Sequence, residues 1–278
     1  MRGVEHAGTA SKLRQSRRAF MAARKDVLRR IRKIWAALGA GAIVIFVAWS
    51  AVAFRASPAA QEALSSDSRV VVKREGNHWR FTPKDGKPRN VALLFFPGAM
   101  VDPAAYAPLT RSVALAGYQA VLMELPRRGV MGGADGAEAL GRAVMNQAPD
   151  VSAWIVAGHS RGAVVAATLA HQGGPGIAGL VLIGTTHPRD FTLAETRFPV
   201  TKIMGTKDGI APVAASEANR RLLPKDARWV VIEGANHSQF GSYGFQPGDR
   251  FATIDRAAQQ NETLKEIVVM LEATSRDR

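Results

Sequence analysis

The sequence predicts an α/β protein with an open, mostly parallel, doubly wound sheet of eight strands, preceded by one transmembrane helix. Short apolar runs alternate with amphipathic segments from about residue 69 onward, and several of these runs are continuous Val, Ile and Leu. Such alternation is typical of βα units, and continuous apolar strands are typical of a sheet that helices cover on both faces. The third observation is one long uncharged segment near the N-terminus.

The composition is that of a globular protein with a core, since 47% of the residues are hydrophobic. The chain has no cysteine, which excludes disulfides and thiolate metal sites. The net charge is +14, and residues 1–33 alone carry eleven Lys and Arg against two acids. A basic head beside an apolar run indicates membrane topology. No recognised nucleic-acid fold accompanies this charge, so we expect no nucleic-acid partner.

Residues 34–54, IWAALGAGAIVIFVAWSAVAF, carry no charge. As a helix they would extend about 31 Å, close to the hydrocarbon thickness of a bilayer. Trp35 and Trp49 stand near the two ends, where interfacial aromatic residues are common. A buried core helix is one alternative, although such helices usually keep a polar face. A cleaved signal peptide is another, with a small-residue site at Ala51-Val52-Ala53, but the apolar run is longer than usual. We predict an uncleaved signal anchor.

The charge asymmetry around this segment predicts its orientation. Eleven basic residues precede it, whereas only Arg55, Arg69, Lys73 and Arg74 follow within the next twenty residues. This asymmetry places the N-terminus in the cytoplasm and the rest of the chain on the extracytoplasmic side. The predicted organisation is therefore a basic cytoplasmic head (1–33), a transmembrane signal anchor (34–54), a linker rich in Ala and Ser (55–68) and one α/β domain (69–278).

Within the domain, strands are predicted at residues 69–73, 78–82, 91–96, 119–124, 153–157, 179–183, 200–204 and 229–232. Helices are predicted at residues 103–116, 134–147, 161–171, 213–222 and 254–273. The first two strands form a hairpin that opens the sheet.

The motif G-x-S-x-G occurs as Gly158-His159-Ser160-Arg161-Gly162, between the strand at 153–157 and the helix at 161–171. In this context the serine sits on a sharp strand–turn–helix bend with its hydroxyl exposed above the sheet. The alternative is a tight turn in which Ser160 only caps the helix.

A nucleophilic serine needs a base and an orienting acid, and in such sheets they follow in the order serine, acid, histidine. His237 follows the last predicted strand and is the predicted base. His171 lies in the helix after the serine and is expected to point away from it, and His187 follows the sixth strand, which is early for the base. Asp208 follows the strand at 200–204 and is the predicted acid, with Asp190 as the rival. For the oxyanion we expect the N–H groups of Arg161 and of Ala99, with Met100 as the second choice beside Ala99.

These stretches together resemble the α/β-hydrolase superfamily, in particular its compact bacterial branch related to dienelactone hydrolases. The resemblance runs from about residue 70 to the C-terminus and rests on FFPGAMVDPAAYAPLTRSVALAGY (95–118), GHSRGA (158–163), GTKDGIAP (205–212) and EGANHSQFGSYGFQPGD (233–249). It implies the α/β-hydrolase fold and hydrolysis of carboxylic esters or related compounds, with no metal or organic cofactor. Dienelactone hydrolases use a cysteine nucleophile, where this chain has Ser160.

We therefore expect a membrane-anchored serine hydrolase that cleaves a small-molecule ester through an acyl-enzyme. Thioester hydrolysis is the alternative reaction, and a catalytically silent fold that serves as a membrane-tethered binding module is the alternative class. Only residues 184–199 separate the sixth and seventh predicted strands, which leaves no room for a large lid. Arg127 and Arg128 follow the fourth strand, where they would either favour an anionic acyl group or form a solvated pair.

Overall fold

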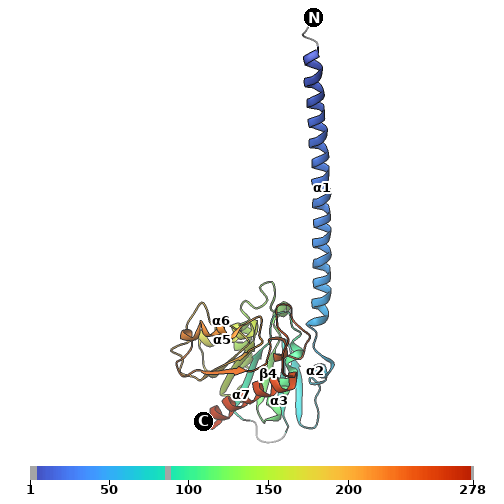
Figure 1. The fold of residues 1–278 in the computed structure, drawn as a ribbon. Coiled ribbons are helices and arrows are strands. Elements are labelled where there is room, and N and C mark those ends of the chain that lie inside the picture. Colours follow the sequence, from blue (N-terminus) through green and yellow to red (C-terminus); the bar gives the residue numbers. More distant parts are fainter. Residues whose placement is uncertain (1–4, 85–88, 277–278) are drawn as a thin grey trace. The chain divides into compact units, whose positions relative to one another are not determined.

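The computed structural model describes residues 5–84 and 89–276 and has the predicted fold class. One sheet of eight strands, in the order β1-β2-β4-β3-β5-β6-β7-β8, forms its centre (Figure 1). The strands are β1 (Val70–Glu75), β2 (His78–Pro83), β3 (Val91–Phe96), β4 (Gln119–Met123), β5 (Ala153–His159), β6 (Ile177–Ile183), β7 (Val200–Gly205) and β8 (Arg228–Ile232).

The sheet is antiparallel only at its first edge. β1 pairs with β2 and β2 pairs with β4 in antiparallel fashion, while every later pairing, from β4·β3 to β7·β8, is parallel. The carboxyl ends of β3, β5, β6, β7 and β8 therefore meet at one edge, and the loops that follow these strands lie together there.

Helices cover both faces, as the continuous apolar strands predict. The helical segments of the domain are η1 (Pro103–Tyr106), α3 (Ala107–Leu115), η2 (Pro126–Gly129), α4 (Ala137–Asn146), α5 (Arg161–Gln172), α6 (Val213–Glu217), η3 (Arg220–Leu222), η4 (Ser238–Phe240) and α7 (Arg256–Arg276). Alternate residues of β3 point to opposite faces. Phe95 belongs to the core that α3 and α7 cover, and Phe96 belongs to the core that α4 and α5 cover.

All eight predicted strands are present, and their ends differ from the prediction by at most two residues. The predicted helices at 103–116 and 213–222 are each divided into a 3₁₀ turn and a short α-helix. Pro108 follows the first of these breaks, and a proline lacks the N–H that a continuous helix would use.

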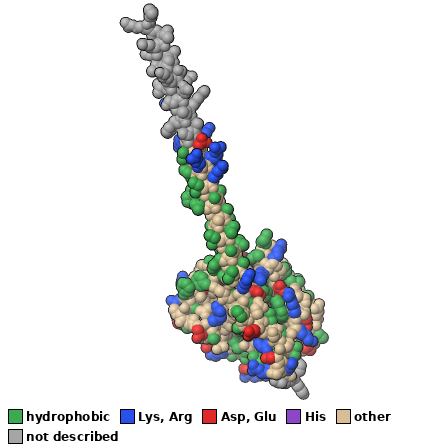
Figure 2. Space-filling view, turned by 90° about the vertical axis from the view of Figure 1, so that its right-hand side faces the viewer, with side chains coloured by type: hydrophobic (Ala, Val, Ile, Leu, Met, Phe, Trp, Pro, Cys, Tyr) green, Lys and Arg blue, Asp and Glu red, His purple; other side chains and the backbone are tan. Residues whose placement is uncertain are grey.

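The N-terminal segment is one helix, α1 (Glu5–Ala53), so the predicted head and anchor are not separated by a break. Its stretch Arg24–Ala53 is long and apolar enough to cross a membrane. Figure 2 shows hydrophobic side chains along most of this stretch, with Lys and Arg gathered at its N-terminal end, within residues 24–33. Ile34, Trp35 and Ile45 are each more than half exposed. Residues 1–4 of the predicted head and 277–278 of the predicted domain lie outside the described residues.

Residues 55–68, predicted as a linker from their composition, are ordered against the domain. They contain the short helix α2 (Pro58–Glu62), and Ala60 within it is fully buried. Ser57 N donates to Ser242 O at 2.8 Å, and Arg111 donates to the carbonyl of Ala63. Ala and Ser side chains are small enough to pack closely against a domain. A composition rich in them therefore does not distinguish a free linker from a segment that packs on the domain.

Candidate active site

Ser160 stands on the bend between β5 and α5, at φ 54° and ψ −119°. Such a backbone conformation is strained for a residue with a side chain and is found at functional sites. The two flanking glycines allow the bend. A Cβ on Gly158 would lie 2.4 Å from the Gly162 carbonyl carbon, and a Cβ on Gly162 would lie 2.1 Å from Phe96 O. A side chain at either position would therefore crowd the bend.

Asp208 and His237 come together from the loops after β7 and β8. The distance from His237 Nδ1 to Asp208 Oδ2 is 2.9 Å, and both side chains are fully buried. The other carboxylate oxygen, Asp208 Oδ1, accepts the N–H groups of Ile210 and Ala211 at 2.9 and 2.6 Å. The Asp208 carboxylate is thus held by the turn that carries it, and it orients the imidazole ring of His237.

The second nitrogen of the same ring, His237 Nε2, is buried and has no hydrogen-bond partner among the described residues. Because Nδ1 faces a carboxylate, it carries the proton, and Nε2 presents its lone pair. Ser160 lies on the same edge of the sheet. Its neighbour His159 packs against His237 with the ring centroids 4.4 Å apart. The arrangement supplies a nucleophile candidate, a free basic nitrogen and an orienting acid.

The rival residues lie elsewhere. Asp190 is exposed to solvent and stands near His187 rather than in the buried pair. His171 is exposed on α5, where its Nδ1 lies 3.2 Å from Thr192 O and its ring stacks on Phe191.

The loop after β3 lies beside the serine, since a Cβ on Gly98 would be 3.6 Å from Ser160 Cβ. Three consecutive N–H groups of this loop differ in their partners. Gly98 N donates to the Tyr106 hydroxyl at 3.2 Å, and Met100 N donates to Arg128 O at 2.8 Å. Ala99 N has no partner within the described part of the chain. Arg161 N also has none, because it begins α5 and the first turn of a helix leaves its donors unpaired. The geometry favours Ala99 over Met100.

Of the two arginines after β4, Arg128 contacts this loop. Arg127 and Arg128, in η2, both have positive φ, at 49° and 51°. The carbonyl oxygen of Arg128 accepts the N–H of Met100, and the guanidinium of Arg128 lies 3.7 Å from the carboxylate of Asp102. Both side chains are solvent-exposed.

Two buried groups beside the serine were not predicted. His159 Nδ1 lies 2.7 Å from the Tyr106 hydroxyl, which also accepts Gly98 N–H. Burial, together with the neighbouring His237, holds the pKa of His159 well below its ordinary value, so the ring is neutral. Burial also raises the pKa of Tyr106. The pair links the bend at Ser160 to the loop after β3 (residues 97–102), which we call the oxyanion loop for its predicted role. Neither spacing nor hydropathy indicates this pair.

Asp249 is the third residue that the sequence did not indicate. Its Oδ1 accepts the N–H groups of Gly209 and His237, both at 3.2 Å. Its Oδ2 accepts the N–H and the hydroxyl of Ser238 at 2.8 and 2.6 Å. The Asp249 carboxylate therefore joins the turn that carries Asp208 to the loop that begins at His237, which we call the histidine loop.

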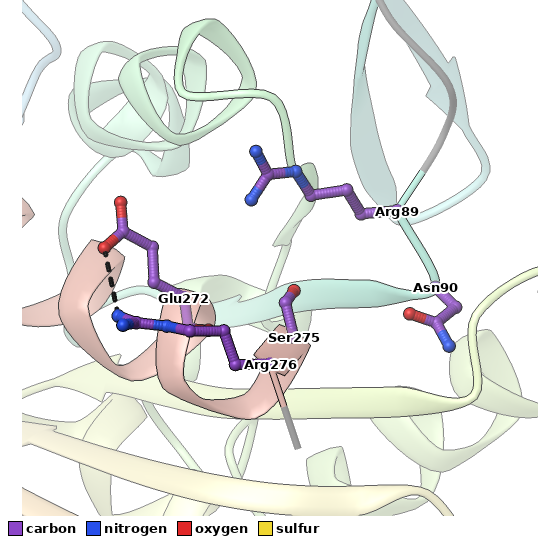
Figure 3. A pocket seen from close by; sticks show the side chains of 5 residues that line it. All are labelled: Arg89, Asn90, Glu272, Ser275 and Arg276. Atoms are coloured by element: carbon purple, nitrogen blue, oxygen red, sulfur yellow. Dashed lines mark hydrogen bonds and ion pairs between the residues drawn. The ribbon is translucent and has the colours of Figure 1, made fainter. Parts of the chain in front are cut away.

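A pocket of about 740 Å³ lies away from these residues (Figure 3). Arg89 and Asn90, just before β3, and Glu272, Ser275 and Arg276, at the end of α7, line it. It stands at the amino end of β3, opposite the edge that carries Ser160, so it is separate from the candidate site. No group of three or more His, Asp or Glu suited to a metal ion occurs among residues 5–84 and 89–276.

The chain was compared with known proteins. The sequence profile of a family described as "Alpha/beta hydrolase family" matches residues 92–261. No curated protein matches the chain. Many solved structures do.

One similar structure is a dienelactone hydrolase-like promiscuous phosphotriesterase, P91, from metagenomic libraries. It has 16% identity and a TM-score of 0.52, over 73% of this chain and 97% of that one. A predicted CIB-like hydrolase from Thermoplasma acidophilum has 14% identity and a TM-score of 0.55, over 71% and 98% of the two chains. An alpha-beta serine hydrolase homologue from Coxiella burnetii has 18% identity and a TM-score of 0.50, over 74% and 98%. At these identities the likeness concerns the fold.

Proposed function

The chain belongs to the alpha/beta hydrolase family, and from this premise we propose that it is a serine hydrolase that cleaves a carboxylic ester or a related acyl compound. Ser160 is the nucleophile, His237 the base and Asp208 the acid. The observation that carries the proposal is the fully buried hydrogen bond from His237 Nδ1 to Asp208 Oδ2, which leaves Nε2 free on the edge of the sheet that bears Ser160.

Acylation begins when Ser160 Oγ attacks the carbonyl carbon of the ester and His237 Nε2 takes the hydroxyl proton. The hydrogen bond between these two atoms forms as the substrate binds, since such contacts often tighten only then. Asp208 stabilises the imidazolium, and the N–H groups of Ala99 and Arg161 bind the oxyanion. One such donor is worth about 10²–10³ in rate in a serine protease.

The tetrahedral intermediate collapses with cleavage of the C–O bond, and His237 returns its proton to the departing alcohol. In deacylation a water molecule gives its proton to His237 and attacks the acyl carbon, which releases the carboxylic acid and restores Ser160. Water supplies both the oxygen and the proton of the net reaction, so no redox partner takes part.

The short connection between β6 and β7 supports a substrate of small or medium size. Residues 184–199 contain no helix or strand, so this connection holds no lid domain.

We further propose that residues 34–54 anchor the enzyme in a membrane, with the N-terminus in the cytoplasm and the hydrolase domain on the extracytoplasmic side. The helix Arg24–Ala53 has a mean hydropathy of 2.1 in its most apolar window, and only 6% of that window is buried inside the protein. An apolar surface of this kind is unfavourable in water and suits a lipid environment.

The test is reaction of the full chain with a fluorophosphonate probe, together with hydrolysis of p-nitrophenyl esters of graded acyl length. We expect labelling of the wild type and of Ser68→Ala, an exposed serine, and none of Ser160→Ala. If the folded wild type neither reacts nor hydrolyses any ester of the series, the chain is instead a silent fold used for binding.

A further inference from the structure

The chain passes from the apolar segment into the domain with no free residues between them. Ala53 O accepts Gly244 N–H at 2.7 Å, and Phe54 O accepts Asp102 N–H at 2.9 Å. The Phe54 side chain is buried, with its ring centroid 6.0 Å from that of Tyr243. The apolar run ends at Phe54. With the proposed anchor, the domain is therefore fixed to the residues at which the chain leaves the membrane.

The two loops that hold these residues are the loops of the active site. Asp102 stands two positions after Met100, at the end of the oxyanion loop. Gly244 belongs to the loop that begins at His237, and Ser57 N is bonded to Ser242 O in the same loop. The edge of the sheet that carries Ser160 is therefore the part of the domain next to residues 53–57, where the domain joins the apolar segment.

The histidine loop exposes a pair of stacked aromatic rings at this place. Phe245 follows Gly244 directly, so its Cα lies about 3.8 Å from that of Gly244. Its ring is 4.8 Å from that of Phe251 at an interplanar angle of 21°. Phe251 is 80% exposed and Phe245 is 37% exposed, and Ile210, also partly exposed, approaches Gly248 of the same loop. We call Phe245, Phe251 and Ile210 the aromatic patch.

We propose that the aromatic patch lies in the headgroup region of the bilayer that holds residues 34–54, and that the substrate is an amphiphilic ester that reaches Ser160 from that bilayer. The substrate assignment rests on the proposed hydrolase function and on the proposed anchor. The headgroup region is only about 5–8 Å thick on each side, and the patch begins one residue from a backbone contact to Ala53.

The chemistry of the patch agrees with this partner. Aromatic side chains are enriched at the membrane interface, where an apolar ring contacts acyl chains beside wet headgroups. Arg55, directly after Phe54, and Arg250, directly before Phe251, are also exposed. Guanidinium groups pair well with lipid phosphates. Two large exposed rings would otherwise remain in water, which is unfavourable.

A bilayer position also fits the site. The substrate would enter beside the oxyanion loop and the histidine loop, both tied to residues 53–57, without a lid to open. The reaction is the hydrolysis described above, in which the acyl C–O bond is cleaved and water supplies the hydroxyl of the acid and the proton of the alcohol.

The first experiment measures depth in the membrane and does not depend on catalysis. The chain has no cysteine, so a single one can be labelled selectively. Full-length Phe251→Cys carrying an NBD fluorophore is reconstituted into phosphatidylcholine vesicles that contain nitroxide-labelled lipid. The control is Asn90→Cys, an exposed residue at the opposite edge of the sheet (Figure 3). We expect at least threefold stronger quenching at position 251. Equal quenching at both positions overturns the proposal, as does a blue-shifted label that lipid nitroxides do not quench, because protein would then cover the patch.

The second experiment concerns the substrate. The Phe245→Ser/Phe251→Ser double variant is compared with the wild type on a medium-chain ester held in vesicles and on soluble p-nitrophenyl acetate. The ratio of the two rates should fall about tenfold, because each ring lost from the interface weakens binding to lipid. Val269→Ser, which removes an exposed apolar side chain from α7, should leave the ratio as in the wild type.

The two experiments separate the possible failures. A wild type that is inert toward every ester, yet is quenched at position 251, rejects the hydrolase function and the ester substrate but supports the membrane contact. An active enzyme without quenching rejects the membrane contact and leaves the hydrolase function intact. An unchanged ratio of rates in the double variant rejects delivery from the bilayer.

Discussion

The carboxylate of Asp249 binds the backbone N–H of His237, the proposed catalytic base, and we predict that it holds this residue in position. Its replacement by asparagine tests this directly. It accepts five hydrogen bonds, of which the N–H groups of Gly209, His237, Ser238 and Arg250 donate four and the Ser238 hydroxyl donates the fifth. An amide has nearly the same shape but only one acceptor oxygen. In either orientation its NH₂ group therefore faces at least one backbone donor.

The magnitude follows from the donors that lose their acceptor. If the amide oxygen keeps Gly209 and His237, the N–H of Ser238 is left unpaired, while the Ser238 hydroxyl turns to accept from the new NH₂ group. An unsatisfied buried donor costs about 1–3 kcal/mol. A loss of about 2 kcal/mol lowers the melting temperature of a domain of this size by about 4–8 °C. A displacement of His237 by about 1 Å would reduce kcat/KM by roughly 10²-fold.

The assay combines thermal unfolding with kcat/KM on one p-nitrophenyl ester. Asp226→Asn is the matched control, because Asp226 is exposed and such surface changes usually stay within about 0.5 kcal/mol. We expect Asp249→Asn to unfold earlier and to turn over more slowly than both the wild type and the control. If Asp249→Asn keeps the melting temperature and the kcat/KM of the wild type, this carboxylate does not position His237 and the reasoning fails.

Three further predictions concern the acid, a buried lysine and the membrane. Asp208→Asn should reduce kcat/KM by roughly 10⁴-fold, as a triad Asp→Asn change does in a serine protease, while Asp190→Asn should stay near wild type; the reverse pattern would reassign the acid. Burial lowers the pKa of Lys202 from 10.5 to about 7. The unfolded chain therefore binds more protons between these pH values, and the unfolding free energy should rise with pH across the window, by at most about 1.4 kcal/mol per pH unit. Urea unfolding at pH 7 and 9.5 should show a smaller rise in Lys202→Met than in the wild type. A reporter that is active only outside the cytoplasm, fused after residue 278, should be active, and a stable but inactive fusion would reverse the proposed orientation.

The sheet was predictable because its strands are apolar on both faces. β3, β5 and β6 are short Val-, Ile-, Leu- and Phe-rich runs bounded by Gly, Pro or polar residues, and their burial leaves little freedom in where they begin. The mostly parallel, doubly wound class of the sheet followed from the alternation of strands and helices. The divisions within the helices at 103–116 and 213–222 were not predicted, because local tertiary packing, rather than periodicity, decides them.

The residues nominated for the site were predictable to the extent that chain order fixes them. Ser160, Asp208 and His237 each follow a predicted strand, and parallel strands bring their carboxyl ends to one edge. Tyr106, His159 and Asp249 could not be found in this way. Their contacts cross between segments far apart in the sequence, as between Tyr106 and His159, and no period or spacing encodes such a pairing.

The segment at 55–68 shows most clearly that composition alone does not predict whether a segment is flexible. Its composition indicates a linker, but flexibility depends on whether neighbouring parts of the domain offer partners, and here Ser242, Asp102 and Arg111 do. A fragment that begins at residue 60 lacks the backbone contacts of Ala53, Phe54 and Ser57 and the buried Phe54 ring.

Burial of such a ring is worth about 1.5–3 kcal/mol, and each backbone hydrogen bond about 1 kcal/mol. The fragment that begins at residue 60 should therefore be less stable, by on the order of 5 kcal/mol, than one that begins at residue 53, which retains these contacts. Its melting temperature should be roughly 10–20 °C lower. Its kcat/KM should also fall, because the lost contacts hold the oxyanion loop and the histidine loop. The measurement is thermal unfolding and ester hydrolysis of both fragments side by side. If they melt together and turn over equally, residues 53–59 are a dispensable linker after all, and the domain is then free to move away from the membrane surface.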